Sequence, residues 1–122
     1  MDYPQKDLII VMTKGINDEL SSVGLTLANG ALTAEMTVGL FLTSNAIDLV
    51  RKKGLDYTHV HPMEPLKQML DAFMARGGNV WACPPCTHAR GYDKDSIIDG
   101  VEIRGASVMF ERIKAGAATL TF

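Results

Sequence analysis

The chain contains two cysteines, Cys83 and Cys86, which stand three positions apart in the segment NVWACPPCTHARGY, residues 79–92. A Cys-x-x-Cys pair can close a disulfide, bind a metal, exchange electrons with another thiol, or carry sulfur as a persulfide. Each of these chemistries needs a different setting, so the elements that position the two sulfurs decide among them.

The residues around the pair predict a strand that ends at Cys83 and a helix that follows it. The two prolines at 84–85 suit the first turn of a helix, where a missing N–H costs no hydrogen bond. Cys83 would then lie near the positive end of the helix dipole, which favours a thiolate. His88 and Arg90 could add positive charge. We therefore expect Cys83 to be alkylated faster than Cys86.

The pair has other interpretations besides a sulfur nucleophile. Trp81 suggests a thioredoxin-like redox site, but the pair comes after residue 80 of 122 and no companion proline loop follows. A zinc site needs four ligands, and the cysteines would require His88 together with His59 or His61. Covalent haem attachment would need a histidine where Thr87 stands. Finally, both cysteines could serve only as small apolar residues.

His59 and His61 occupy alternate positions, so on an extended segment their side chains would face the same side. A histidine there could act as an acid or base near neutral pH, although two solvated loop histidines are the simpler interpretation. We take the two cysteines as candidate catalytic residues, and His61, His88 and Arg90 as candidates for contact with the substrate.

Four apolar runs predict strands buried on both faces, the kind found in parallel sheets. They lie at residues 7–13, 36–43, 79–83 and 118–122, with a weaker candidate at 100–105. Ligand sites of parallel sheets lie at the carboxyl ends of the strands, and the cysteine pair stands at one such end. Lys14, Asn17 and Ser44 stand at two others, where a turn or capping role is the ordinary expectation.

Helical segments are expected between the strands, at residues 18–32, 45–53, 65–76 and 106–115, with Gly54 as the natural stop of the second. The first helix carries one apolar face, made by Leu20, Val23, Leu27 and Ala31. Its small residues Gly24 and Ala28 would permit close packing against a sheet or a second subunit. The alternation of strand and helix predicts one α/β domain, residues 1–122, with a mostly parallel sheet.

Composition excludes several classes of partner. Hydrophobic residues make up 47% of the chain and the formal charge is −2, and no basic patch interleaved with aromatics predicts nucleic-acid binding. The N-terminus lacks the basic start and long apolar region of a signal peptide. No run approaches the roughly 18 apolar residues of a membrane helix. We expect a cytoplasmic protein without membrane contact, whose thiols are kept reduced.

Three segments resemble the DsrE-like sulfur-relay proteins, which include the DsrE, DsrF and TusD groups. They are LIIVMTKGINDELSSVGLTLANGALTAEM, VGLFLTSNAIDLV and GGNVWACPPCTHARGY, and together they span nearly the whole chain. The resemblance implies a flavodoxin-like three-layer α/β fold. It also implies a persulfide on the cysteine after the third strand, which by counting back from Arg90 and Gly91 is Cys83. Cys86 is an addition shared with some relatives.

The resemblance further implies an oligomer, and sulfur-donor and sulfur-acceptor proteins as partners. We therefore interpret the chain as a sulfur carrier or sulfurtransferase subunit, in which Cys83 accepts sulfane sulfur and hands it to a partner's cysteine. Cys86 would release sulfide by attacking the persulfide, or protect Cys83 from over-oxidation. This function requires no cofactor and no bound metal. The alternative is a non-catalytic assembly domain, or a redox- or metal-sensing domain, of the same fold.

Overall fold

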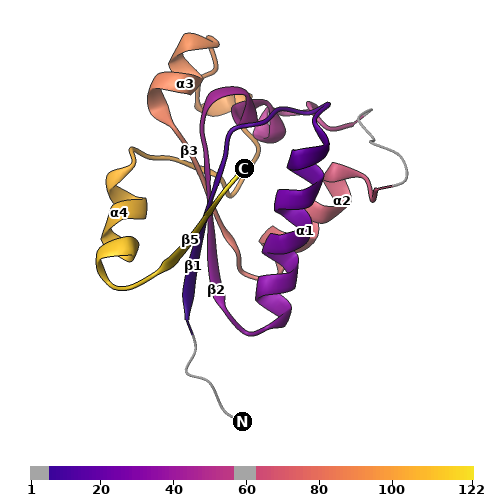
Figure 1. Ribbon diagram of the computed structural model, residues 1–122. Helices are drawn as coiled ribbons and strands as arrows, with labels where there is room; N and C mark the ends of the chain where they lie inside the picture. Colours follow the sequence, from indigo (N-terminus) through magenta and orange to yellow (C-terminus); the bar gives the residue numbers. More distant parts are fainter. Residues whose placement is uncertain (1–5, 57–62) are drawn as a thin grey trace.

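The computed structural model describes residues 6–56 and 63–122. Within them a central sheet carries helices on both faces (Figure 1). The strands are β1 (Asp7–Met12), β2 (Thr37–Leu42), β3 (Asn79–Ala82), β4 (Glu102–Ile103) and β5 (Ala118–Thr121). The α-helices are α1 (Glu19–Thr33), α2 (Leu66–Ala75), α3 (Pro84–Ala89) and α4 (Ser107–Lys114), and two 3-10 helices are η1 (Ser44–Val50) and η2 (Lys94–Ser96).

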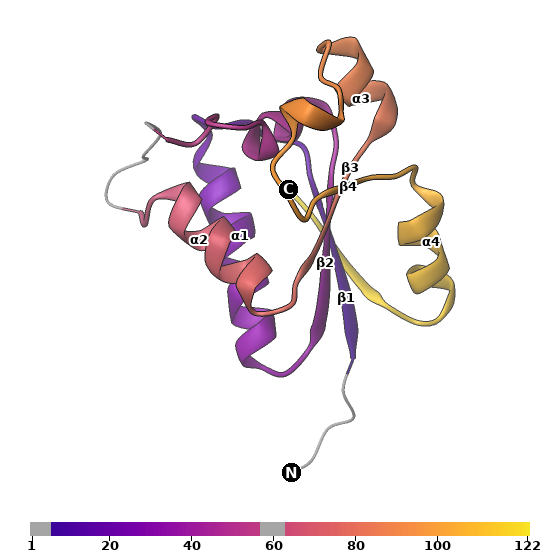
Figure 2. The same cartoon turned by 180° about the vertical axis from the view of Figure 1, so that it is seen from behind.

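The five strands are all parallel and lie in the order β4-β3-β2-β1-β5. The chain moves outward from β1 to β4 and then returns to the other side of β1 as β5. Because crossovers between parallel strands are right-handed, this reversal puts α1 and α2 on one face of the sheet and α4 on the other (Figures 1 and 2). The result is the α/β fold with a parallel sheet that the sequence pattern predicts, in the three-layer, flavodoxin-like form that the family resemblance implies.

Two hydrophobic cores form because successive residues of a strand point to opposite faces of the sheet. The larger core lies against α1 and α2 and includes Leu25, Leu40 and Phe73, all fully buried. The smaller core lies under α4 and is made by Ile9, Phe41, Trp81 and Met109. The continuous apolar runs of the sequence are explained by this burial on both faces.

Helix α1 packs on β1 through its small residues. A Cβ at Gly24 would lie 2.9 Å from Met12 Cε, and Gly24 and Ala28 are buried in the chain's own core. These two residues therefore do not form a surface for a second subunit. The apolar face expected for this helix is also wrong, since Leu20 and Leu27 are 42% and 43% exposed. The buried side is instead made by Ser21, Ser22, Gly24, Leu25 and Ala28.

The helix expected at 45–53 is wrong in type and length. The structure has the 3-10 helix η1, after which Arg51 turns extended and forms an antiparallel bridge with Ile97. This bridge to a residue distant in sequence ends the helix early. Gly54 is not a helix stop but a buried turn residue, because a Cβ there would lie 2.7 Å from the Asp48 carbonyl oxygen.

The other expected strands and helices are present, but the expectation that the run at 118–122 is buried on both faces is wrong: β5 is an edge strand, and Leu120 is 42% exposed. Asp18 caps α1, its carboxylate accepting the Leu20 N–H at 2.8 Å, and the weak candidate at 100–105 is the two-residue edge strand β4. None of the described helices has both the length and the apolar character needed to span a bilayer.

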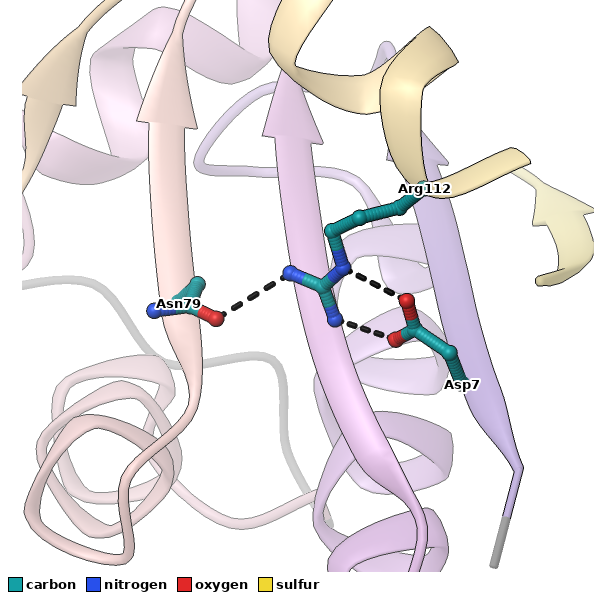
Figure 3. A network of polar contacts seen from close by, with 3 residues as sticks. All are labelled: Asp7, Asn79 and Arg112. Carbon is teal, nitrogen blue, oxygen red and sulfur yellow. Dashed lines mark hydrogen bonds and ion pairs between the residues drawn. The ribbon is translucent and has the colours of Figure 1, made fainter. Parts of the chain in front are cut away.

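A polar network ties α4 to the sheet (Figure 3). Arg112 Nε donates to Asp7 Oδ2 at 2.7 Å, its Nη2 pairs with the other carboxylate oxygen, and its Nη1 donates to Asn79 Oδ1 at 3.1 Å. The guanidinium thus crosses β2 to join the amino ends of β1 and β3. The carboxyl ends of the strands, where the cysteines lie, are at the opposite edge.

Candidate functional site

The cysteine pair lies where β2 and β3 end side by side. Leu42 and Ala82 are register partners, so the next residues along each strand, Thr43 and Cys83, leave the sheet together. The Cys83 N–H donates to the Leu42 carbonyl at 2.9 Å, and the Thr43 N–H donates to the Met12 carbonyl at 3.0 Å. Ladder hydrogen bonds therefore fix the start of both loops that build the site.

Cys83 is the N-cap residue of α3, as the sequence predicts. Pro84 and Pro85 occupy the first turn, and the Cys83 carbonyl accepts the Thr87 N–H at 3.0 Å. Thr87 is fully buried, and its hydroxyl donates to the Pro84 carbonyl at 2.8 Å. Cys83 is half-buried and contacts both cores. The prolines and Thr87 hold the turn between the two cysteines in one conformation.

The polar contacts of the pair gather on Cys86. Its Sγ lies 3.3 Å from the Thr43 hydroxyl and accepts the Ser44 N–H at 3.2 Å. Ser44 has a φ of 54°, a left-handed conformation that non-glycine residues seldom adopt. Cys86 is half-buried, and both cysteines are free thiols. The turn after β2 thus supplies both hydrogen-bond partners of the second cysteine's sulfur.

These contacts lower the pKa of the Cys86 thiol below its ordinary value. The hydrogen bond with Thr43 has the largest effect, and partial burial opposes it. The Ser44 N–H, a hydrogen bond from the Cys83 thiol and the positive charge of Arg90 lower the pKa further. A thiolate accepts hydrogen bonds that a neutral thiol uses only weakly, so each donor favours the ionised form.

Arg90 holds the end of α3 against η1. Its Nη1 donates to the Cys86 carbonyl at 3.2 Å and its Nη2 to Asn45 Oδ1 at 2.9 Å. Nearby, the Tyr92 hydroxyl donates to Asp48 Oδ1 at 2.6 Å, which is the main reason that the pKa of Tyr92 is raised. The contact between α3 and η1 therefore keeps Cys86 beside Thr43.

The other residues expected near the site do not hydrogen-bond to the cysteine sulfurs in the described part of the chain. His88 lies on α3 and is exposed, whereas His59 and His61 fall outside the described residues. Lys14 and Asn17 have exposed side chains. Within residues 6–56 and 63–122, no three His, Cys, Asp or Glu side chains gather as they would to hold a metal ion.

Two residues of the site were not predicted from the sequence: Thr43, which contacts Cys86 Sγ, and Asn45, which accepts from Arg90. A signal for Thr43 exists, because it ends the strand that precedes the cysteine strand in the sheet. Pairing the two strand ends in register places it opposite Cys83, and one helical turn then brings Cys86 toward it. Asn45 has no such signal, since its contact with Arg90 depends on the 3-10 form of η1.

Comparisons with known proteins agree with this architecture. A family model described as DsrE/DsrF-like matches residues 6–122. An uncharacterized protein of Methanopyrus kandleri, MK0008, is 30% identical over 96 residues, which are 78% of this chain and 75% of that protein.

Solved structures show the same fold. The ychN protein of E. coli is 28% identical, with a TM-score of 0.78 over 98% of this chain and 100% of that one. MTH1491 of Methanobacterium thermoautotrophicum, titled a protein of unknown function, is 17% identical, with a TM-score of 0.70 over 98% and 100%. Since the family model covers nearly the whole chain, this protein belongs to the DsrE/DsrF-like family.

Proposed function

We propose that the chain is a sulfur-relay protein whose cysteine pair takes up sulfane sulfur, holds it as a persulfide and passes it to a cysteine of a partner protein. The observation that carries the proposal is a sulfur, Cys86 Sγ, held by hydrogen bonds with Thr43 and Ser44 at the carboxyl ends of the strands of a parallel sheet. Family membership supports the class of reaction, because DsrE-type proteins act in sulfur relay with partners.

The chemistry needs a thiolate and an electrophilic sulfur. A thiolate attacks the outer sulfur of a persulfide donor, the donor's S–S bond breaks, and the donor leaves as a thiol or thiolate. No oxidant is consumed, since the sulfur moves at constant oxidation state. A partner thiolate then repeats the step on the loaded protein. The family resemblance assigns the carried sulfur to Cys83, while the proposal as a whole requires only that one sulfur of the pair holds it.

The site suits transfer between proteins better than capture of a small metabolite. Its sulfurs are half-buried at the surface edge of the sheet rather than enclosed, and Pro85, His88 and Ala89 of α3 are exposed beside them. A partner's cysteine could reach such a sulfur directly. We propose homo-oligomers as the working form and a cytoplasmic location, in line with the sequence expectations.

Intact mass spectrometry tests the proposal. The reduced protein is incubated with a polysulfide or a small persulfide, desalted and weighed, and the expected result is a gain of one sulfur per chain that dithiothreitol removes. The matched control is the double variant Cys83→Ser/Cys86→Ser, which should gain none. If the wild type takes up no sulfur from either donor, the relay proposal is wrong and the assembly or sensor function replaces it.

A further inference from the structure

We infer that Cys86, held by the Thr43–Ser44 turn, is the ionised sulfur of the pair and the one that attacks the donor, while Cys83 serves as the resolving thiol. The assignment of the thiolate stands on geometry alone; its role in sulfur transfer rests on the proposed function. This order is the reverse of the one that the family resemblance implies.

The first argument is that both hydrogen-bond partners of Cys86 Sγ come from one dipeptide that follows another strand, β2. The Thr43 hydroxyl and the Ser44 N–H lie 3.3 and 3.2 Å from Sγ, across 43 and 42 residues of chain. The N–H donates to the sulfur with Ser44 at φ 54°. A left-handed serine costs free energy and persists where the surroundings fix it, and such outliers cluster at functional sites.

The second argument is that Cys83 lacks the donors that its position would normally supply. An N-cap side chain accepts N–H groups of the first helical turn. Residues 84–85 are prolines, which have no N–H, and the Cys83 side chain makes no capping hydrogen bond. The helix is also only six residues long. The prolines thus remove two first-turn donors, and the Cys83 side chain does not accept the remaining N–H, that of Cys86.

The third argument is the balance of charge around Cys86. Arg90 donates only to two neutral oxygens, the Cys86 carbonyl and Asn45 Oδ1, and no carboxylate pairs with it in the part of the chain that the structure describes. On η1, which packs against α3, the Asp48 carboxylate accepts from Tyr92. His88 of α3 is exposed. Of these groups, Arg90 acts on the sulfur through its charge, and it favours an anion.

Loading, discharge and resolution of the persulfide all proceed without an external oxidant. The Cys86 thiolate attacks the outer sulfur of a donor persulfide, R–S–SH, forming Cys86–S–SH and releasing R–S⁻. Discharge to a partner thiolate reverses this bond exchange. If no partner is present, the Cys83 thiol loses its proton and attacks Cys86 Sγ. The S–S bond of the persulfide breaks, the outer sulfur leaves as sulfide, and a Cys83–Cys86 disulfide remains. In that step the two cysteine sulfurs are oxidised and the sulfane sulfur is reduced.

The thiolate assignment is tested by titration without any sulfur donor. Cys83→Ser leaves Cys86 as the sole thiol, and its ultraviolet thiolate absorbance and its iodoacetamide rate are followed against pH. An ordinary cysteine titrates with a midpoint near pH 8.5. We expect the midpoint of Cys86 to be lower. In the Cys83→Ser background, adding Thr43→Val should raise the midpoint of Cys86. Adding Thr43→Ser instead, which keeps the hydroxyl, should leave the midpoint low. Thr119→Val, on the exposed edge strand β5, is the matched control and should leave it in place.

Two results would overturn the assignment. One is an ordinary midpoint for Cys86 in Cys83→Ser; the other is a midpoint that Thr43→Val does not move while circular dichroism shows the fold intact. If one of these variants does not fold, Ser44→Gly is used in its place. Glycine keeps the N–H and accepts the left-handed backbone, so the thiol midpoint of Cys86 should stay low.

Sulfur loading of the two single variants tests the transfer step separately. Cys83→Ser should load sulfur and hold it longer than the wild type, because no resolving thiol remains, whereas Cys86→Ser should load at least tenfold more slowly. Equal loading of both variants would overturn the transfer order. Failure of all proteins to load would remove the proposed function and leave the titration result standing.

Discussion

The guanidinium of Arg112 stacks on the indole of Trp81, with Arg112 Cζ 5.1 Å from the ring centroid. Both side chains lie over Gly39 on β2, where an added Cβ would be 2.4 Å from Trp81 Cζ3 and 2.8 Å from Arg112 Nη1. The missing side chain of Gly39 is therefore what lets the arginine reach from α4 to Asp7 and Asn79 (Figure 3). Trp81 is also two residues before Cys83, so this contact supports the strand that carries the site.

Gly39→Ala is expected to destabilise the protein by about 1–3 kcal/mol, since the methyl group forces Trp81 or Arg112 to move in a packed core. Urea unfolding at neutral pH measures the change. Gly30→Ala is the matched control: Gly30 lies inside α1 with no atom within 4 Å of an added Cβ, so alanine should stabilise by about 0.5–1 kcal/mol. An unchanged free energy of unfolding in Gly39→Ala would show that Arg112 is not held over β2 at this position.

The Asp7–Arg112 pair should show a coupling of about 1–2 kcal/mol in a double-mutant cycle of Asp7→Asn and Arg112→Met. Both side chains are largely buried, at 28% and 20% exposed, and the contact is bidentate. The control cycle uses Lys67–Asp71 on the surface of α2, whose side chains are 55% and 57% exposed. Solvent screening should make its coupling much smaller. Equal couplings would contradict the packing described for α4.

The contribution of Cys86 to stability is expected to grow with pH. Its pKa is lowered in the folded chain, first by Thr43, so ionisation favours folding. The gain is complete above the ordinary cysteine pKa of the unfolded chain and is lost as pH falls through the lowered folded pKa. Unfolding of the wild type and Cys86→Ser in reducing buffer should therefore differ increasingly between about pH 6 and pH 9. A constant difference across this range would argue against a stabilised thiolate.

Tyr92→Phe is expected to cost about 1 kcal/mol near neutral pH, because it removes a 2.6 Å hydrogen bond to the Asp48 carboxylate. Since that bond raises the pKa of Tyr92 in the folded chain, its contribution is full below about pH 10, the unfolded value, and is lost as pH rises through the folded pKa. Unfolding at about pH 7 and about pH 11 should show a smaller difference between the two proteins at the higher pH. A difference that rises with pH would contradict the contact.

The order of most strands and helices could be predicted from the sequence, because apolar runs and helix-starting prolines mark them locally. The apolar runs that became β1, β2 and β3 are continuous because both faces of the sheet are covered there. Pro84 and Pro85 mark the start of α3 by chemistry that no tertiary contact overrides. The placement of Cys83 at a strand end and helix cap could be predicted for this reason.

Long-range contacts explain the parts that could not be predicted. The Arg51–Ile97 bridge ends η1 where periodicity continues a helix, and Met12 beneath Gly24 sets the rotation of α1 on the sheet. The division of polar contacts between the cysteines depends on the backbone angle of Ser44, for which the sequence gives no signal. Helix-dipole reasoning alone pointed to Cys83, because it counts the position of a residue and not the donors that surround its sulfur.

The pairing of β5 with β1 determines where a label or tag fused to the carboxyl terminus leaves the protein. The Phe122 N–H donates to the Val11 carbonyl, and the Thr13 N–H donates to the Phe122 carbonyl, both at 2.8 Å. Polypeptide fused after Phe122 would thus emerge at the carboxyl edge of the sheet, about 14 Å from β3 across three strand spacings. A purification tag placed there would crowd the approach of a docking partner.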